Sequence, residues 1–188
     1  MDTFYAEREI MELYVRNNII PITGELTHSQ AELIIGLLSL YLVNGSKKIT
    51  LYFCNAMGGS YDSCVAISDE IDTLKEFGVT FETLAAGKVC SAHALLFLKG
   101  DERKIRKNAE LMFHEVSEAK GIIGTQYEIK KEVERLKKEN DFIINIIAKA
   151  TDKDKKQIRK DINYDHYFNA SAAVKYGLAH EVSTETLI

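Results

Sequence analysis

Three residues of this chain have the side chains that a nucleophile, a general base and an orienting acid require. Ser91 lies in the segment Gly87-Lys88-Val89-Cys90-Ser91, His114 follows in Met112-Phe113-His114, and Asp165 comes much later. In acyl transfer, a serine hydroxyl attacks a carbonyl carbon, an imidazole accepts the hydroxyl proton, and a carboxylate orients the imidazole. The chain order Ser-His-Asp differs from that of the three common serine hydrolase folds, so a triad here would imply another fold.

These residue types are common, and a glycine turn followed by serine also has a simpler explanation. Glycine can serve the turn, and serine can cap the helix that follows. Two strand-to-helix junctions are nevertheless unusual, at Gly58-Gly59 and at Gly87 to Ser91. Such junctions direct backbone N–H groups toward one point, where they can stabilise an oxyanion or bind phosphate, although Gly58-Gly59 alone is also typical of a tight turn. The phosphate-binding glycine motifs are absent, which disfavours nucleotide binding.

Length and composition indicate one globular domain spanning residues 1–188. We also expect no cofactor. Hydrophobic residues make up 46% of the chain and charged residues 28%, which is typical of a soluble domain with a sizeable core. The net charge of −4 provides no broad cationic surface, so we expect no nucleic-acid partner. The histidines show no metal-ligand spacing with the cysteines, and we expect no metal.

The cysteines and the apolar segments indicate a protein of a reducing compartment without a membrane partner. Cys54, Cys64 and Cys90 are an odd number and lie in apolar segments, as expected for reduced thiols in the cytoplasm or in an organelle matrix or stroma. The first residues are acidic and lack the apolar region of a secretory signal. No apolar run approaches the ~20 residues that span a bilayer, so we expect no membrane partner.

Apolar periodicity predicts alternating strands and helices. Strand, turn and helix at this spacing imply crossover connections and an α/β fold. The expected strands are 19–23, 48–54, 79–86, 106–113 and 178–182, and the expected helices are about 28–43, 61–77, 91–98, 125–150, 152–162 and a last one from Asn169 to Gly177.

The helix expected over about 125–150 has two interpretations. Its apolar residues alternate steps of four and three, which is typical of a coiled-coil seam. It is either an amphipathic helix that packs on its own core, or a projecting helix that packs against a partner subunit, with Asn140 helping to fix the register. The seam consists of Ile129, Val133, Leu136, Asn140, Ile143 and Ile147.

Taken together, these segments resemble the ClpP family of self-compartmentalising serine peptidases over nearly all of residues 16–182. Each segment alone is weak, and their order and spacing together make the resemblance specific. The segments that resemble family motifs are 16–24, 51–59, 87–92, 112–114, 165–170 and 173–178.

The resemblance implies a role for each site residue. Ser91 would be the nucleophile, His114 the general base and then acid, and Asp165 the residue that orients His114. Backbone N–H groups of Gly59 and Ala92 would form the oxyanion hole. The implied fold is crotonase-like, with repeated ββα units and a projecting handle helix over about 125–150.

The resemblance also implies an activity and partners. The protein would be a serine endopeptidase that cleaves peptides or unfolded proteins inside a homo-oligomeric ring, with a second ring and a Clp ATPase as further partners. Two other functions stay open at this point: a weak or inactive structural ring subunit, and an acyl-CoA enzyme of the crotonase superfamily. The latter would use the same backbone oxyanion hole without a Ser-His-Asp set.

Overall fold

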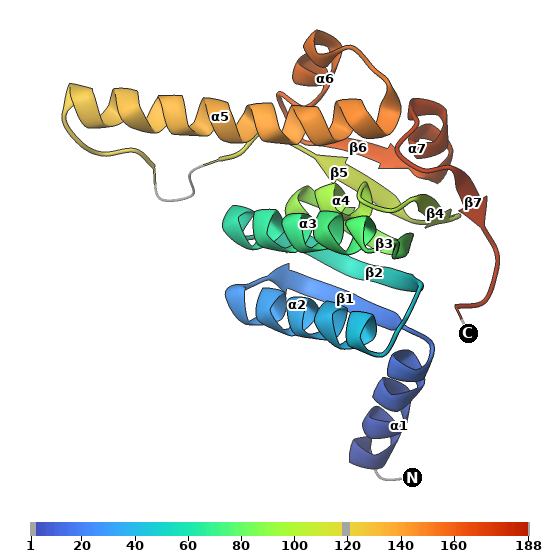
Figure 1. Ribbon diagram of the computed structural model, residues 1–188. Coiled ribbons are helices and arrows are strands. Elements are labelled where there is room, and N and C mark those ends of the chain that lie inside the picture. The colour runs from blue at the N-terminus through green and yellow to red at the C-terminus, as the bar shows by residue number, and fades with distance from the viewer. Residues whose placement is uncertain (1–2, 118–120, 188) are drawn as a thin grey trace.

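The computed structural model describes residues 3–117 and 121–187, and it is a mixed α/β structure (Figure 1). In chain order the elements are α1 (Thr3–Arg16), β1 (Ile19–Leu26), α2 (His28–Val43), β2 (Lys48–Gly59), α3 (Tyr61–Glu76), β3 (Thr80–Cys90), α4 (Ser91–Phe97), β4 (Glu102–Arg106), β5 (Glu110–Phe113), α5 (Gln126–Thr151), α6 (Lys155–Asp161), β6 (His166–Asn169), α7 (Ala170–Tyr176) and β7 (Glu181–Ser183).

The described strands form one sheet that divides at β3. Strands β1, β2, β3, β4 and β7 are neighbours in that order and run parallel. The first part of β3 pairs with β4, whereas Lys88 to Cys90 pairs with β5. Strand β5 pairs in turn with β6, in antiparallel fashion. Because Cys90 lies opposite Met112, the residues that follow these two strands emerge at the same edge of the sheet.

Polar side chains define where most helices begin. The residue before the helix accepts a hydrogen bond from a backbone N–H of the first turn at Thr27, Ser60, Thr125, Asp154 and Asn169. Each such cap satisfies an N–H group that has no partner within the helix, and contributes roughly 1 kcal/mol. Helix α4 differs, since Cys90 before it supplies no side-chain cap.

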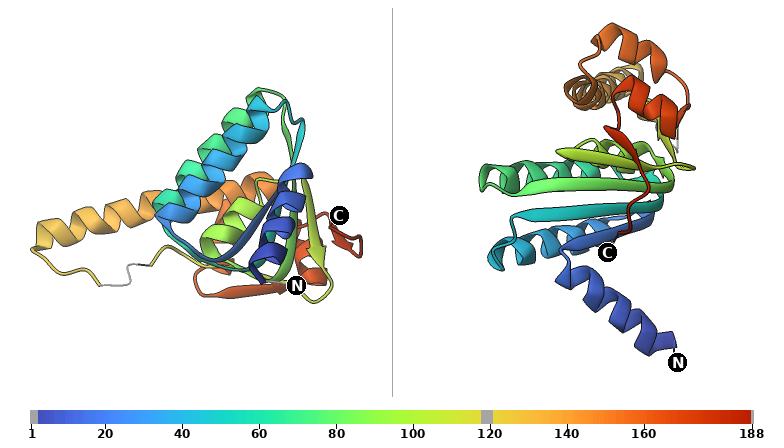
Figure 2. Two further views of the ribbon diagram at one scale, coloured as in Figure 1. Left: turned by 90° about the horizontal axis from the view of Figure 1, so that it is seen from below. Right: turned by 90° about the vertical axis from the view of Figure 1, so that its right-hand side faces the viewer.

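The core lies between the sheet and helices α2, α3 and α4, and Figure 2 shows α2 and α3 on one side of β1 and β2. Alternate residues of β2 point into this layer, and Ile49, Leu51 and Phe53 are fully buried. The ring of Phe53 packs edge-to-face on that of Phe97, with centroids 6.2 Å apart. Burial of a large apolar side chain contributes roughly 1.5–3 kcal/mol, so this layer holds the β2–α3 and β3–α4 junctions in place.

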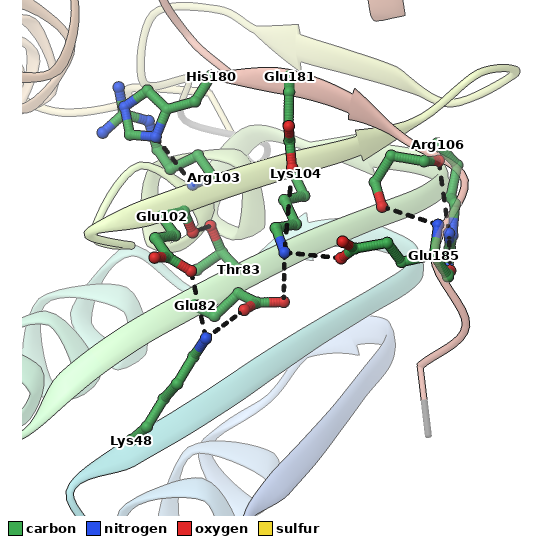
Figure 3. Close-up of polar contacts among 11 residues, drawn as sticks. Lys48, Glu82, Thr83, Glu102, Arg103, Lys104, Arg106, His180, Glu181 and Glu185 are labelled. Atoms are coloured by element: carbon green, nitrogen blue, oxygen red, sulfur yellow. Dashed lines mark hydrogen bonds and ion pairs between the residues drawn. The ribbon is translucent and has the colours of Figure 1, made fainter.

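Charged side chains cover the other face of the central strands (Figure 3). Lys48 lies 2.6 Å from Glu82, and Lys104 lies 3.6 Å from Glu82 and 2.8 Å from Glu185. Parallel strands are usually covered on both faces. Here an ionic network attaches the C-terminal segment to the face that the helices leave open.

Helix α5 fits both interpretations of its seam, each over one half. It extends beyond the sheet (Figures 1 and 2). In the C-terminal half Ile143 and Ile147 are buried in the chain's own core, whereas Val133 in the N-terminal half is 39% exposed. The Oδ1 of Asn140 accepts a 2.7 Å hydrogen bond from the Val116 N–H of the same chain, and its role in partner register stays a prediction.

The remaining differences from the expected elements have local causes. The strand expected over 106–113 is confined to β5, because Lys107 and Asn108 form a turn closed by a hydrogen bond from Ala109 N–H to the Arg106 carbonyl. Strand β4 before this turn was not predicted, apart from Arg106. Turns of this kind favour asparagine. Helix α1 and strand β6 were not predicted, and the closing strand is shifted to Glu181–Ser183. Among the described helices, none combines the length and the apolar character that crossing a membrane requires.

Candidate active site

Ser91 is held in a disfavoured backbone conformation where β3 passes into α4. Its φ is 54°, in the left-handed region that residues other than glycine rarely adopt. Such strain costs on the order of 1–3 kcal/mol and occurs often at functional sites. The sharp turn presents the hydroxyl at the edge of the sheet beside β5, while α4 behind it is buried from Ala92 to Phe97.

His114 reaches Ser91 and is itself oriented by a backbone carbonyl. Its Nε2 lies 2.9 Å from the Oγ of Ser91, and its Nδ1 lies 2.6 Å from the carbonyl oxygen of Glu115. A carbonyl oxygen can only accept, so Nδ1 carries the proton and donates it to Glu115. The Nε2 lone pair is therefore free to accept the Ser91 hydroxyl proton, which is the tautomer that a general base needs.

Asp165 is not brought to His114 in this structure. It lies on the exposed segment between α6 and β6, and its carboxylate makes no hydrogen bond within residues 3–117 and 121–187. Its charge still acts close to the site: burial first, and the charge of Asp165 as a lesser cause, raise the pKa of the Cys90 thiol. The structure thus brings Ser91 and His114 together and leaves the third predicted residue apart.

Asp161, the other aspartate of this region, is engaged elsewhere. Its carboxylate accepts hydrogen bonds from the hydroxyl of Tyr176, at 2.6 Å, and from the amide of Gln157, at 2.7 Å. Its carbonyl accepts a bond from Nδ1 of His166 at 2.9 Å. These contacts join α6, β6 and α7, so Asp161 has a structural role.

Two glycines allow the end of β2 to lie against Ser91. A Cβ atom on Gly58 would lie 2.6 Å from the Cβ of Ser91 and 3.2 Å from its Oγ, and one on Gly59 would lie 2.5 Å from the carbonyl oxygen of Leu26. Both glycines also have positive φ, 89° and 140°. A side chain at either position is excluded, which explains the two glycines better than a simple tight turn does.

A buried histidine that the sequence analysis did not single out fixes this glycine segment. His93 is fully buried, and its Nδ1 accepts a 3.0 Å hydrogen bond from the Gly58 N–H. Its Nε2 then donates to Oε1 of Gln30 at 3.2 Å, and the Gln30 amide donates to the Thr23 carbonyl. Burial lowers the pKa of His93 to about 4, so the ring is neutral at pH 7 and accepts from Gly58. The only signal in the sequence was its position two residues after Ser91.

A cavity of about 220 Å³ opens beside the Ser91 hydroxyl. Gly59, Ala92 and His114 line it on the side of Ser91, so backbone and base face the same space. Helix α5 supplies two charged residues to its wall, Arg135 and Glu139, which the sequence analysis did not single out. A space of this size accommodates one large amino-acid side chain beside the Ser91 hydroxyl.

Comparison with known proteins decides the family. The sequence model of the Clp protease family matches residues 5–186. The chain belongs to the Clp protease family. It is 29% identical over 188 residues to the ATP-dependent Clp protease proteolytic subunit 2 of Chlamydia pneumoniae, covering 97% of this chain and 90% of that protein. It is also 29% identical over 174 residues to proteolytic subunit 1 of Rhodopirellula baltica, covering 91% of this chain and 74% of that one.

Membership of the Clp protease family confirms the resemblance and the fold class inferred from the sequence. The mostly parallel sheet with its covering helices and the long helix α5 agree with the Clp protease fold. Proteins of the Clp protease family form oligomeric rings and act on protein substrates.

Proposed function

We propose that this Clp protease family protein is a serine endopeptidase that cleaves peptides or unfolded proteins inside a ring-shaped chamber. The single observation that carries the proposal is the 2.9 Å approach of His114 Nε2 to Ser91 Oγ, with Nδ1 donating to a carbonyl. A hydroxyl and an imidazole in this geometry and tautomer are a nucleophile with its base. Family membership supports the peptide bond as the target.

The proposed mechanism is acyl transfer in two steps. Ser91 attacks the peptide carbonyl while His114 accepts its proton, and His114 then gives the proton to the leaving amine. Water activated by His114 hydrolyses the ester on Ser91. We assign the oxyanion hole to the backbone N–H groups of Gly59 and Ala92, supported by the position of both residues on the cavity wall beside Ser91. Stabilisation of this kind contributes a factor of about 10²–10³ to turnover for each donor.

We propose that Asp165 contacts His114 only in the assembled particle. In the described chain the Glu115 carbonyl occupies the bond to His114 Nδ1 that Asp165 would make. Asp165 follows directly on Tyr164, which is 82% exposed. A partner subunit that covers Tyr164 would displace the segment carrying Asp165, and would place its carboxylate on His114. A carboxylate stabilises the imidazolium formed during attack better than a neutral carbonyl does, so assembly should activate the enzyme.

A second candidate is a catalytically weak or inactive ring subunit, and the exposed position of Asp165 favours it. In that case the segment carrying Asp165 would stay away from His114 in the assembled particle. The acyl-CoA alternative has no comparable support, since the chain belongs to the Clp protease family.

We further propose that the exposed half of α5 contacts other copies of the chain in a single or double ring, supported by its exposed residues Ile129 and Val133. A Clp ATPase is the proposed partner that delivers substrates. The thiols of Cys54, Cys64 and Cys90 are unpaired, which supports the cytoplasm or an organelle matrix or stroma as the compartment.

The test is hydrolysis of a fluorogenic peptide and of an unfolded protein across a range of protein concentrations, with particle mass measured in parallel. We expect the rate to rise faster than linearly while the particle grows, and Ser91→Ala to abolish it. Asp165→Asn should lower the rate by orders of magnitude, and the matched variant Asp161→Asn should lower it less. A rate strictly proportional to concentration across the dissociation range, with Asp165→Asn fully active, would exclude the role assigned to Asp165.

A further inference from the structure

The cavity beside Ser91 contains a buried carboxylate that is only half satisfied. Glu139 of α5 is 8% exposed and lines the cavity together with Ser91 and His114. One of its oxygens, Oε1, accepts a hydrogen bond from Arg135, one turn earlier on the same helix. The other oxygen, Oε2, is buried and has no partner among the residues that the structure describes.

A buried carboxylate oxygen without a partner is costly, and it is a strong acceptor for a donor that reaches it. Arg135 does not cancel this acceptor, because it also pairs with Glu132. Two glutamates and one arginine leave a net charge of −1 in this trio. Burial first, and next the charge of Glu139, raise the pKa of the Tyr61 hydroxyl on the same wall, whereas the charge of Arg135 lowers it to a lesser extent. The charge of Glu139 therefore acts at this wall more strongly than that of Arg135.

One part of the wall suits an aliphatic chain. Leu95, Phe113 and Ile143 line the cavity, and all three are buried in the core. A long side chain can lay its methylene groups along apolar surface while its polar end reaches an acceptor. The combination of this apolar part of the wall with the unpartnered oxygen of Glu139 therefore favours long side chains that end in N–H groups.

We infer that the cavity beside Ser91 is a subsite for a substrate side chain that ends in an N–H donor, with Glu139 as the residue that determines this specificity. The inference rests on the proposed peptidase function, since it assigns the side chain to the residue whose carbonyl Ser91 attacks. Lysine, arginine and glutamine belong to this class. Lysine satisfies both the acceptor and the charge.

Binding to the full-length Ser91→Ala variant tests the inference without any need for turnover. Two fluorescent peptides are compared by anisotropy, identical except that one carries lysine and the other norleucine before the expected scissile bond. We expect the lysine peptide to bind roughly ten- to hundredfold more tightly, the range for one hydrogen bond to a charged group. Adding Glu139→Gln should reduce this ratio to within a few-fold of one, and Glu139→Leu should reverse it.

The control is Glu134→Gln in the same background, which removes one negative charge from an exposed position of the same helix and should leave the ratio unchanged. Circular dichroism verifies that each variant is folded. If a variant at Glu139 does not fold, the ratio for the Ser91→Ala protein alone decides, and equal or weaker binding of the lysine peptide overturns the inference. A preference for the lysine peptide that is unchanged after Glu139→Gln overturns the inference as well.

Failure of the peptidase proposal gives a different result. It is seen in the protein with Ser91 intact, as absence of peptide hydrolysis and of reaction with a fluorophosphonate, whatever the two peptides do in the binding experiment. Hydrolysis that prefers norleucine to lysine would instead leave the peptidase proposal in place and reject the specificity assigned to Glu139.

Discussion

Gly58 and Ser91 approach each other so closely that a Cβ atom added to Gly58 would lie 2.6 Å from the Cβ of Ser91. The nucleophile candidate therefore packs directly against the backbone of β2. The same glycine donates its N–H to the buried ring of His93. One residue thus connects the position of Ser91 to a hydrogen-bond network that reaches Gln30 and β1, and a change at Gly58 should be felt at the hydroxyl.

The first prediction concerns Gly58→Ala. The added methyl group collides with Ser91. In addition, alanine at a φ of +89° costs about 1–3 kcal/mol in backbone strain. We expect loss of peptide hydrolysis together with a lower free energy of unfolding. The matched control is Gly78→Ala, where φ is +79° but nothing lies within 4 Å of the added Cβ. It should lose less stability than Gly58→Ala, because only the strain is shared, and it should retain activity. Equal activity of the two variants would refute the steric argument.

The second prediction uses the strained backbone of Ser91. Glycine adopts a φ of 54° without the penalty that alanine incurs, so Ser91→Gly should be more stable than Ser91→Ala by about 1 kcal/mol, although both lack activity. Urea unfolding measures the difference. Ser171 lies within helix α7, where glycine costs about 1 kcal/mol relative to alanine. The same pair of changes at Ser171 should therefore give the opposite order, and the same order at both sites would contradict the strained conformation.

The third prediction is a pH dependence of stability from His93. Its pKa is lowered to about 4 in the folded protein, whereas an unfolded histidine titrates near 6.5. Between these values the unfolded chain binds a proton that the folded chain does not. The free energy of unfolding should therefore fall as pH is lowered from about 6.5 to 4, by up to about 3 kcal/mol.

Unfolding of the His93→Gln variant tests this assignment. Glutamine does not titrate and can keep a hydrogen bond to Gly58, so the loss of stability between pH 6.5 and 4 should be smaller than in the unmodified protein. His28→Gln, at an exposed histidine, is the control and should retain the original pH dependence. An unchanged dependence in His93→Gln would show that the buried ring is not its source.

The fourth prediction concerns assembly through α5. Changing Ile129 and Val133, each 39% exposed, to lysine should leave a folded chain that forms a smaller particle by native mass measurement. Glu134→Lys adds charge to the same half of the helix and should leave the particle size intact. By contrast, Ile143→Lys should unfold the chain, because Ile143 is 5% exposed. An unchanged particle after the double change would mean that this half of α5 is not an assembly surface.

Local patterns in the sequence predicted most of the fold, because strands and caps depend on nearby residues. Residues 28–43 and the cap at Asn169 follow from apolar spacing and polar start signals. The proximity of Ser91 and His114 came from family resemblance, and its physical origin is the pairing of β3 with β5. This long-range pairing cannot be read from either segment alone.

The parts of the site that the sequence analysis missed depend on contacts between distant segments. His93 resembles any apolar-helix histidine until Gly58 and Gln30 are seen on its two nitrogens. Glu139 looks like one more charge on a charged helix until its burial beside Ser91 is known. The position of Asp165 depends on an exposed segment, for which the chain's own periodicity gives no constraint.

Reaction with a fluorophosphonate tests most directly whether Ser91 is a nucleophile activated by His114. Mass analysis of the intact protein and of its tryptic peptides should show one adduct per chain, located on Ser91. The adduct should be absent in Ser91→Ala and should form much more slowly in His114→Ala, since removing the base leaves a hydroxyl of ordinary reactivity. An adduct on another serine, or equal labelling of His114→Ala and the unmodified protein, would contradict the account.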